Sequence, residues 1–347
     1  MWLGTVPCRH MDAYETTTTW SALAARVGSA QQLLVVTHRK PDGDAAGSCL
    51  GLARALPQPV AVHLVGPVGA NVQQLIRASD DVCISDADPE HEPDLIVLVD
   101  TGAWVQVGPL ADWLRARRDR VVGLDHHPTG NDIAPDRIID PSMASATMMV
   151  LRLLDELEIE VDDAGGVAEA LFAGLATDTG WFRHSNADAA AFTMAGRLVG
   201  AGVDRDRLYA MFEENGSVAK LTLQSRALGS LELAGNGRHA IMMLTDEDFQ
   251  TSGASRAELD GLVNQPLAIE EVVASFLLYA EEDGVTKISL RSKPPLPGRD
   301  TLDVSAVASQ LGGGGHVRAS GARVAGPLPA AREKLLSAIA EVMDADG

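Results

Sequence analysis

Carboxylate and imidazole side chains gather in four short segments of the chain. Three of these segments end an apolar run, and the fourth contributes a carboxylate without a histidine. Acidic groups that converge in a folded protein repel one another unless a cation neutralises them. The sequence therefore predicts a metal-dependent enzyme, with ligands drawn from His38-Arg39-Lys40-Pro41-Asp42-Gly43-Asp44, Val99-Asp100-Thr101, Asp125-His126-His127 and Thr177-Asp178-Thr179-Gly180.

The ligand types favour Mn²⁺, with Mg²⁺, Fe²⁺ or Co²⁺ as alternatives, because carboxylate and imidazole are harder ligands than thiolate. Five or six ligands are too many for one catalytic zinc ion and suit two ions that share a carboxylate. Asp100, which ends a central apolar run, is the candidate for that bridge. Two ions about 3.5–4 Å apart can hold the attacking and leaving oxygens of a phosphoryl displacement and lower the pKa of a water. Phosphoester hydrolysis is the predicted reaction.

Each of these residues, taken alone, has an ordinary structural interpretation. Asp42 can be a turn residue, Asp178 a solvent-facing group at a helix end, and His126 a histidine of the core. Their joint occurrence at matching strand ends favours the metal site.

The elements that must position these segments follow from the apolar runs before them. Runs over 33–38, 94–100 and 120–125 are typical of strands buried on both faces. Helical spacing over 46–56 and 109–118 lies between them, so strands and helices alternate as in a parallel α/β sheet. Ligands bind beyond the carboxyl ends of such strands, and we expect the segments to converge on one crevice.

The domain organisation follows from the texture of the remaining sequence. Helices are predicted over 146–157, 166–176 and 188–199, and the second of these places Asp178 at a helix end that faces the crevice. A domain boundary is predicted near Arg226. The expected parts are a flexible extension over 1–19, a catalytic domain over 20–200, a helical connector over 201–225 and a substrate-binding domain over 226–347. Met11, within the extension, can be the true translation start.

The last of these parts reads as a smaller mixed α/β domain. Strands are predicted over 240–244, 272–278 and 286–291, and helices over 255–263, 304–311 and 330–343. A loop is predicted over 294–298.

The glycine run Gly312-Gly313-Gly314-Gly315-His316 is predicted to be a loop that binds a phosphate or ribose. Residues without a Cβ atom let backbone N–H groups approach such a ligand closely. The alternative is a flexible linker, which the small-residue segment Ala319-Ser320-Gly321-Ala322 disfavours. Further predicted substrate-binding residues are Arg183, Arg291, His316 and Arg318, although Arg291 can equally be a surface charge.

Composition limits the class of protein. The 347 residues, 46% of them hydrophobic, are enough for two domains. The three cysteines, Cys8, Cys49 and Cys83, form no Cys-x-x-Cys pair, which fits a reducing cytoplasm. No apolar stretch suits a signal peptide or a membrane span, so no membrane partner is expected. The formal net charge of −20 disfavours binding to long duplex nucleic acid and indicates a solvated acidic surface.

Together these motifs resemble the DHH phosphoesterase superfamily, in the two-domain branch with a DHH-associated C-terminal domain. The namesake triplet is Asp125-His126-His127, and the first motif has the form His-x-x-x-Asp-x-Asp, followed by Ala45-Ala46-Gly47-Ser48. Asp100 and Asp178 fill the second and fourth motifs, and the glycine run matches the substrate-binding loop of the C-terminal domain. The resemblance covers residues from about 31 to 324.

The resemblance implies a fold, a ligand set and two cations. The expected fold is an N-terminal parallel sheet with helices on both faces and a smaller mixed α/β C-terminal domain, with the active-site cleft between them. One Mn²⁺ would be held by His38, Asp42 and Asp100, and the other by Asp44, Asp100, His126 and Asp178. His127 would then contact the phosphate or support the ligands. The expected catalytic residues are Asp42, Asp44, Asp100, His126, His127 and Asp178.

Length and acidic charge resemble the nanoRNase branch, whose members shorten very short RNAs and dephosphorylate 3′-phosphoadenosine 5′-phosphate. Alternatives are a phosphodiesterase for cyclic dinucleotides or their linear products, a pyrophosphatase and a non-catalytic nucleotide-binding regulator. Two departures from relatives bear on the substrate: Ser145 and Thr147 flank Ala146 where adjacent hydroxyls are common, and 102–108 lacks an Arg or Asn. The expected partner is a short RNA or nucleotide, and a homodimer is compatible with the resemblance.

Overall fold

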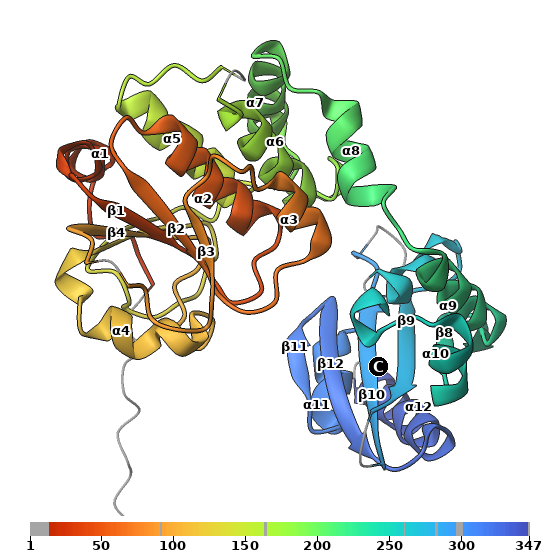
Figure 1. Cartoon of the computed structure of the whole chain (residues 1–347). Coiled ribbons are helices and arrows are strands. Elements are labelled where there is room, and N and C mark those ends of the chain that lie inside the picture. Colours follow the sequence, from red (N-terminus) through yellow and green to blue (C-terminus); the bar gives the residue numbers. More distant parts are fainter. Residues whose placement is uncertain are drawn as a thin grey trace, which may run out of the picture. The chain divides into compact units, whose positions relative to one another are not determined.

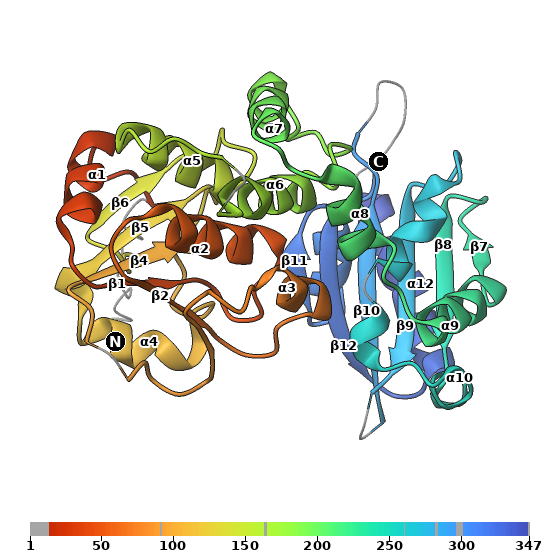
Figure 2. The same ribbon diagram turned by 45° about the horizontal axis from the view of Figure 1, so that its top comes forward.

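The computed structural model describes residues 14–90, 92–162, 165–259, 261–281, 284–295 and 301–345 of the chain. It divides into two compact units, Met1–Asn215 and Gly216–Gly347. Each unit has its own sheet and its own hydrophobic core (Figures 1 and 2). The predicted α/β class is confirmed for both.

The division between the units falls within the segment expected as a connector, 201–225. Helix α8 (Arg205–Glu213) belongs to the first unit, because Leu208 is buried in its core. Helix α9 (Val218–Gly229) belongs to the second, because Leu223 and Ala227 pack into a core of that unit. The division therefore lies earlier in the chain than the boundary expected near Arg226.

The first unit is built on a six-stranded sheet in which all neighbours run parallel. The strand order is β3-β2-β1-β4-β5-β6, so β1 and β4 are central and β6 is an edge. The three apolar runs predicted as strands form β1, β4 and β5. The bounds are β1 (Leu33–Val36), β2 (Val60–Leu64), β3 (Val82–Ile84), β4 (Leu95–Val99), β5 (Val121–Asp125) and β6 (Asp136–Ile139).

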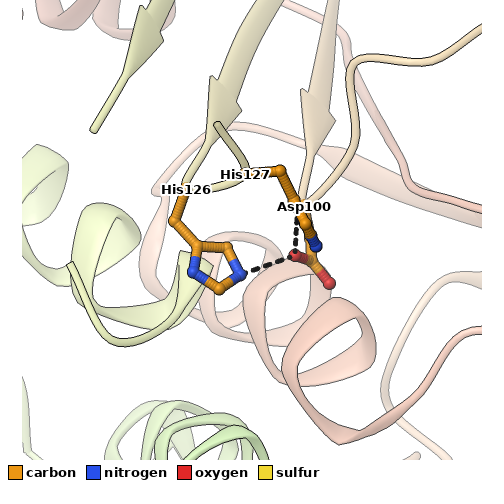
Figure 3. A group of neighbouring side chains, drawn as sticks. All are labelled: Asp100, His126 and His127. Atoms are coloured by element: carbon orange, nitrogen blue, oxygen red, sulfur yellow. Dashed lines mark ion pairs between the residues drawn. The ribbon is translucent and has the colours of Figure 1, made fainter. Parts of the chain in front are cut away.

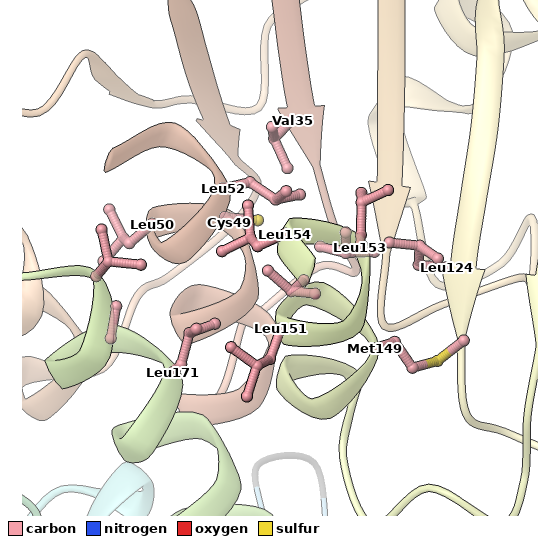
Figure 4. Close-up of a cluster of buried hydrophobic side chains, with 14 of the residues drawn as sticks. Val35, Cys49, Leu50, Leu52, Leu124, Met149, Leu151, Leu153, Leu154 and Leu171 are labelled. Atoms are coloured by element: carbon pink, nitrogen blue, oxygen red, sulfur yellow. The ribbon is translucent and has the colours of Figure 1, made fainter. Parts of the chain in front are cut away.

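The central strands are buried on both faces because successive side chains point to opposite sides of the sheet. In β1, Leu33 and Val35 pack into the larger core, which Figure 4 shows in part, and Leu34 and Val36 pack on the other side. Helices α1, α2, α5 and α6 contribute to the larger core, and α4 covers the opposite face. Helices on both faces are thus confirmed.

Ten helical segments accompany this sheet in the described part of the first unit. Most of the α-helices begin at a side chain that caps the first turn, such as Asp42 before α2 and Ser145 before α5. Besides α8, the bounds are α1 (Trp20–Ser29), α2 (Gly43–Ala55), α3 (Ala70–Leu75), η1 (Gly108–Leu110), α4 (Ala111–Arg115), η2 (Arg118–Arg120), α5 (Ala146–Glu156), α6 (Val167–Asp178) and α7 (Ala189–Gly200).

Helices α2 and α6 approach each other at backbone contact. A Cβ atom on Gly47 of α2 would lie 2.4 Å from the carbonyl oxygen of Ala170 on α6. The small residues at the start of α2 therefore have a packing reason. Because these side chains are small, the two helices can lie close together. Asp44 at the start of α2 is then near the end of α6, where Asp178 lies.

The first described residues differ from the expected flexible extension. Thr17 donates its backbone N–H to the carbonyl of Arg137 in β6 at 2.9 Å, and its hydroxyl donates to the carbonyl of Pro135 at 2.7 Å. The Thr16 hydroxyl donates to the carbonyl of Ile139 at 2.9 Å. The outer edge of β6 presents backbone N–H and C=O groups that no neighbouring strand pairs, and hydrogen bonds to them hold residues 14–17 in place. The rest of that predicted extension, with Met11, lies outside the described residues.

The second unit is a mixed sheet of order β11-β12-β10-β9-β8-β7, as the predicted mixed α/β domain requires. Only β8 and β9 run parallel among its described neighbours. One face packs on α11 and α12, and the other on α9 and α10. The strands are β7 (Glu232–Ala234), β8 (His239–Leu244), β9 (Ala274–Ala280), β10 (Val285–Ser292), β11 (Gly314–His316) and β12 (Ala319–Ala325).

Two local predictions in this unit were wrong. The helix predicted over 255–263 is two 3₁₀ segments, η3 (Arg256–Leu259) and η4 (Leu262–Ala268), interrupted by a positive φ at Gly261 and followed by Pro266 inside η4. The glycine run is not wholly a loop, because β11 pairs with β12 at the edge of the sheet. The remaining helices are α10 (Asp246–Ser252), α11 (Val304–Gln310) and α12 (Leu328–Ala345).

Candidate active site

The first motif turns directly from a strand into a helix. Strand β1 ends at Val36, and Asp42 caps α2 by accepting the backbone N–H groups of Asp44 and Ala45 at 3.1 and 3.0 Å. His38 lies between these elements, and its Nε2 atom is 3.9 Å from Asp42 Oδ1. The motif therefore directs His38, Asp42 and Asp44 to the carboxyl end of the sheet, as the sequence predicted.

Asp100 lies immediately after β4 and occupies the centre of the site. Its backbone has a φ of +58° and donates to the carbonyl of Leu124 at 2.9 Å. Its two carboxylate oxygens face imidazoles on either side, with Oδ2 3.4 Å from His38 Nε2. Oδ1 lies 3.3 Å from His126 Nε2 (Figure 3). Burial opposes the ionised form of Asp100, but the facing imidazoles outweigh it and lower its pKa.

Asp44 is buried against the start of α5. Its Oδ2 and Oδ1 atoms accept the backbone N–H groups of Ala146 and Thr147 at 2.6 and 3.0 Å. The free N–H groups and the dipole of a helix N-terminus stabilise a carboxylate in this position. Burial, followed by the charges of Asp100 and Asp178, nevertheless raises the pKa of Asp44 well above its ordinary value.

Asp178 is the last residue of α6 and reaches the same space from the helix side. Burial raises its pKa to about 6, and the nearby charge of His126 opposes that rise. The side-chain amide of Asn186 lies 3.4 Å from Asp178 Oδ2 and also donates to the carbonyl of Ala144. Asn186 thus holds the Asp178 carboxylate beside the start of α5.

His38 and His126 both direct Nε2 toward carboxylates. The Nδ1 atom of His38 lies 3.0 Å from the carbonyl of Arg39, and that of His126 lies 3.3 Å from the carbonyl of Met143. A carbonyl accepts only from a protonated Nδ1, so Nε2 of the neutral ring carries the lone pair that a metal requires. Burial lowers the pKa of both rings, but the neighbouring carboxylates outweigh it and raise the pKa of His38 to about 10 and of His126 to about 9.

His127 has a different arrangement. Its Nδ1 lies 2.7 Å from Oδ1 of Asp125, which also accepts the His127 backbone N–H at 3.1 Å. The hydrogen bond to Asp125 raises the pKa of His127. Asp125 itself is buried, and its other oxygen accepts the hydroxyl of Tyr14. The Nδ1 atom of His127 is therefore occupied, although it lies only 3.8 Å from Asp100 Oδ1.

These residues fit a divalent metal. Among the described residues, three sets of ligand atoms each lie within 4.8 Å of one another: His38, Asp42 and Asp100; Asp44, His126 and Asp178; and Asp100, His126 and His127. Asp100 Oδ1 is buried and accepts no well-directed hydrogen bond, an expensive condition for a carboxylate without a cation. Hard carboxylate oxygens mixed with imidazole nitrogens suit Mn²⁺, Mg²⁺ and similar ions. The sequence-predicted ligands therefore converge on one site.

Two family models match the chain. Residues 32–175 match the DHH family N-terminal domain, and residues 239–345 match the DHHA1 domain. The chain therefore contains a DHH family N-terminal domain and a DHHA1 domain. DHH phosphoesterases are metal-dependent hydrolases, and the Asp and His groups described above lie in this domain or just beyond its matched end.

Relatives and a solved structure agree with this family. The chain is 29% identical to a bifunctional oligoribonuclease and PAP phosphatase of Thermus thermophilus, over 91% of each chain. It is 27% identical to a cyclic-di-AMP phosphodiesterase of Listeria monocytogenes, over 92% of this chain but 49% of that protein. An exopolyphosphatase-related protein from Bacteroides fragilis has the same fold, with a TM-score of 0.84 and 26% identity over 93% of this chain and 95% of that one.

Two of the predicted substrate-binding residues of the DHHA1 domain lie on either side of β12, in one row across the sheet. Arg291 of β10 and His316 of β11 both pair with Ala319 of the strand between them, so all three lie on the same face. His316 and Arg318 are exposed, and so are Gly312, Gly314 and Gly315. The guanidinium of Arg291 also donates to the carbonyl of Leu290 at 2.9 Å.

The four glycines have different structural roles. Cβ atoms on Gly313 and Gly315 would lie 2.2 and 2.6 Å from carbonyl oxygens of β12, and Gly312 has a φ of +74°. A Cβ atom on Gly314 would meet nothing within 4 Å. Close packing therefore accounts for two of the glycines and the turn for a third, while Gly314 is left without a packing reason.

Arg183 lies in the DHH unit, shortly after Asp178. It is exposed, and its Nε donates to the carbonyl of Gly180 at 2.8 Å. This bond holds the base of the guanidinium on the turn that follows Asp178.

Sequence reasoning missed Tyr14, Asn186 and the separate role of Asp125. Tyr14 donates its hydroxyl to Asp125 Oδ2 at 2.6 Å, and burial together with that carboxylate holds the pKa of Tyr14 above its ordinary value. No local sequence pattern predicts this contact, because 111 positions separate the two residues. Among the described residues, no helix has the length and apolar character of a membrane span.

Proposed function

We propose that this chain hydrolyses short oligoribonucleotides and 3′-phosphoadenosine 5′-phosphate with two divalent cations, Mn²⁺ in the first place. The observation that carries the proposal is the convergence of seven Asp and His side chains on one DHH site. The likeness to the Thermus oligoribonuclease and PAP phosphatase over almost the whole length of both chains supports this substrate class.

The two ligand sets give each cation its own residues. His38, Asp42 and Asp100 would hold one ion, and Asp44, His126 and Asp178 the other, with Asp100 between them through its second oxygen. Bound cations would neutralise the carboxylates, polarise a phosphoryl group and lower the pKa of a water. Six ligand side chains are enough for this arrangement.

The chain's own groups would do the remaining work. The start of α5 and the side chain of Asn186 orient Asp44 and Asp178, and backbone carbonyls fix the Nε2 atoms of His38 and His126 toward the ligand sets. His127, whose Nδ1–H is taken by Asp125 and whose pKa that hydrogen bond raises, would in its protonated form donate Nε2–H to a phosphate oxygen of the substrate. Such a donor would stabilise the charge that develops on the phosphoryl oxygens during hydrolysis.

The DHHA1 domain would supply affinity for the nucleotide. Arg291, His316 and Arg318, with the open surface at Gly314, would supply donors that suit a phosphate or ribose; His316 and Arg318 are exposed and Arg291 is partly exposed. Arg183 would add a positive charge on the side of the DHH domain. The net charge of −20 means that such local cations, rather than a basic surface, would bind the substrate.

A second candidate function is hydrolysis of cyclic dinucleotides. The likeness to the Listeria cyclic-di-AMP phosphodiesterase favours it, since 92% of this chain takes part, although the chain spans about half of that protein. The same ligands would serve both reactions, because each breaks one phosphoester bond. The substrate-binding residues alone would decide between them.

The test is a turnover panel with purified protein and Mn²⁺. The substrates are a 5′-phosphorylated diadenylate, RNAs of three to five nucleotides, 3′-phosphoadenosine 5′-phosphate, cyclic di-AMP and pyrophosphate. We expect the first three to be hydrolysed with the highest kcat/KM. A preference for cyclic di-AMP would favour the second candidate, release of phosphate from pyrophosphate alone would contradict both, and nucleotide binding without turnover would indicate a regulator.

A further inference from the structure

Tyr14 connects the first described residues of the chain to the active site. Its hydroxyl donates to Oδ2 of Asp125 at 2.6 Å, and Oδ1 of the same carboxylate faces His127 Nδ1 at 2.7 Å. Asp125 is only 1% exposed, whereas 45% of the His127 side-chain surface is open. The three side chains therefore form a hydrogen-bonded row that runs from a partly buried phenol to an imidazole at the open side of the site.

The backbone around Tyr14 is held by the edge strand of the sheet. The hydroxyls of Thr16 and Thr17 accept the backbone N–H groups of Ile139 and Arg137, each at 2.9 Å, and they also donate to carbonyls of that region. The segment lies before the matched DHH residues, which begin at position 32. It adds a fixed part to the site from outside that domain.

Two glycines make room for the Tyr14 ring. A Cβ atom on Gly102, which follows β4, would lie 1.8 Å from the Tyr14 hydroxyl oxygen. A Cβ atom on Gly130, which follows β5, would lie 2.5 Å from its ring. The nearest atoms to both positions belong to Tyr14, and neither glycine has a positive φ. The loops after β4 and β5 are therefore shaped around this one side chain.

We propose that Tyr14 is a positioning residue for the hydrolysis that Asp125 and His127 serve. With one oxygen bound by the phenol, the buried Asp125 carboxylate has a fixed plane, and its other oxygen holds the His127 ring with Nδ1 inward and Nε2 toward the substrate. Removal of the phenol leaves a buried carboxylate oxygen unpaired, which loosens this arrangement. The inference rests on the proposed function, in which His127 contacts the phosphate of the substrate.

The first test is Tyr14→Phe, which keeps the ring between the two glycines and removes only the donor. Loss of a hydrogen bond that orients an active-site group typically costs about 10-fold or more in activity. We expect kcat for bis(p-nitrophenyl) phosphate and for the diadenylate to fall about 10-fold, with little change in KM and in Tm. The matched control is Tyr209→Phe on α8, which removes the same hydroxyl from an exposed ring and should leave kcat unchanged.

Two further measurements separate positioning from packing. In a His127→Gln background, Tyr14→Phe should cause no additional loss, because its effect passes through His127. Gly102→Ala should reproduce the loss of kcat by displacing the ring, and should cost little more when Tyr14 is already alanine. Independent losses in either pair would contradict the proposal.

A spectroscopic measurement tests the arrangement without any turnover. In the metal-free protein, the His127 Nδ1 proton should exchange slowly with water and give a distinct NMR signal. Tyr14→Phe should broaden or shift that signal, and Tyr209→Phe should not. A Tyr14→Phe protein with an unchanged His127 signal, or with wild-type kcat, would overturn the proposal. If the wild type hydrolyses none of the substrates, the proposed function fails and the NMR signal still decides the role of Tyr14.

Discussion

At the scale of single residues, the site separates three imidazoles by what their Nδ1 atoms contact. Backbone carbonyls take Nδ1 of His38 and His126, which leaves Nε2 facing carboxylates. The Asp125 carboxylate takes Nδ1 of His127 and withdraws that atom from metal binding. The two kinds of histidine should therefore respond differently to substitution.

The first prediction contrasts a ligand with a non-ligand. His38→Ala should weaken Mn²⁺ binding about 10- to 100-fold, because one Nε2 ligand is lost. His127→Ala should leave Mn²⁺ affinity nearly unchanged and reduce turnover. Isothermal titration of both variants measures the affinities. Equal losses of affinity in the two variants would show that the histidines share one role.

The second prediction concerns protons released on metal binding. With pKa values of about 10 for His38 and about 9 for His126, both rings are protonated at neutral pH in the metal-free protein. A metal requires Nε2 without its proton, so Mn²⁺ affinity should rise with pH until these pKa values are passed. The same raised pKa values stabilise the metal-free protein below about pH 6.5, the ordinary histidine value, and that stabilisation is lost as the pH rises through 9 to 10.

Calorimetry in two buffers of different ionisation enthalpy at pH 7.5 checks this prediction. The observed heat should depend on the buffer, because protons pass from the protein to it. Heats that are equal in both buffers, with a pH-independent affinity, would mean that the rings are already neutral.

At the scale of elements, the site depends on the contact between α2 and α6. Gly47 allows the two backbones to meet at Ala170, and that contact brings the start of α2 beside the end of α6. The proposed ligands Asp44 and Asp178 come from these two helix ends. We therefore expect metal binding to depend on the packing of the two helices.

The third prediction tests this coupling with Gly47→Ala. Its Cβ atom would lie 2.4 Å from a backbone oxygen, so α2 must move, and we expect unfolding free energy to fall by about 1–3 kcal/mol and turnover to fall with it. Gly196→Ala on α7 is the matched control, because a Cβ atom there meets nothing within 4 Å. It should stabilise the protein by about 0.5–1 kcal/mol. Denaturant unfolding of both variants decides, and a fully stable, fully active Gly47→Ala protein would contradict the coupling.

The elements differ in how far the sequence could predict them. Runs such as 94–100 are apolar on both faces, and only a buried parallel strand satisfies that pattern, so the central sheet and the ligands at its strand ends were predictable. Helix α10 has a signal that can be read from sequence, because Thr245 and Asp248 cap its first turn reciprocally. Strand β11 and the contacts of Tyr14 depend on partners distant in sequence, and no local pattern encodes them.

At the scale of the whole molecule, the chain combines a DHH domain and a DHHA1 domain, each with its own core. The proposed metal ligands all lie in the first unit, and the exposed residues around His316 lie in the second. Chemistry and affinity should therefore be separable by mutation.

The fourth prediction uses this separation. His316→Ala should raise KM for the diadenylate about 10-fold or more, through loss of a hydrogen bond to a charged phosphate, with a small effect on kcat. Val317→Ala, at an exposed neighbour on the same edge, should change neither constant. Steady-state kinetics with Mn²⁺ measure both. A drop in kcat at constant KM would move His316 from binding to the chemical step.

The central claim is that one metal site organised by Asp100 carries out the hydrolysis. The most direct measurement is hydrolysis of a 5′-phosphorylated diadenylate by chelator-treated protein, before and after addition of Mn²⁺, for the wild type and Asp100→Asn. We predict no turnover without metal, turnover of the wild type on addition of Mn²⁺, and at least about a 100-fold lower rate for a correctly folded Asp100→Asn protein. Equal rates for the two proteins, or full activity in the presence of chelator, would contradict the account.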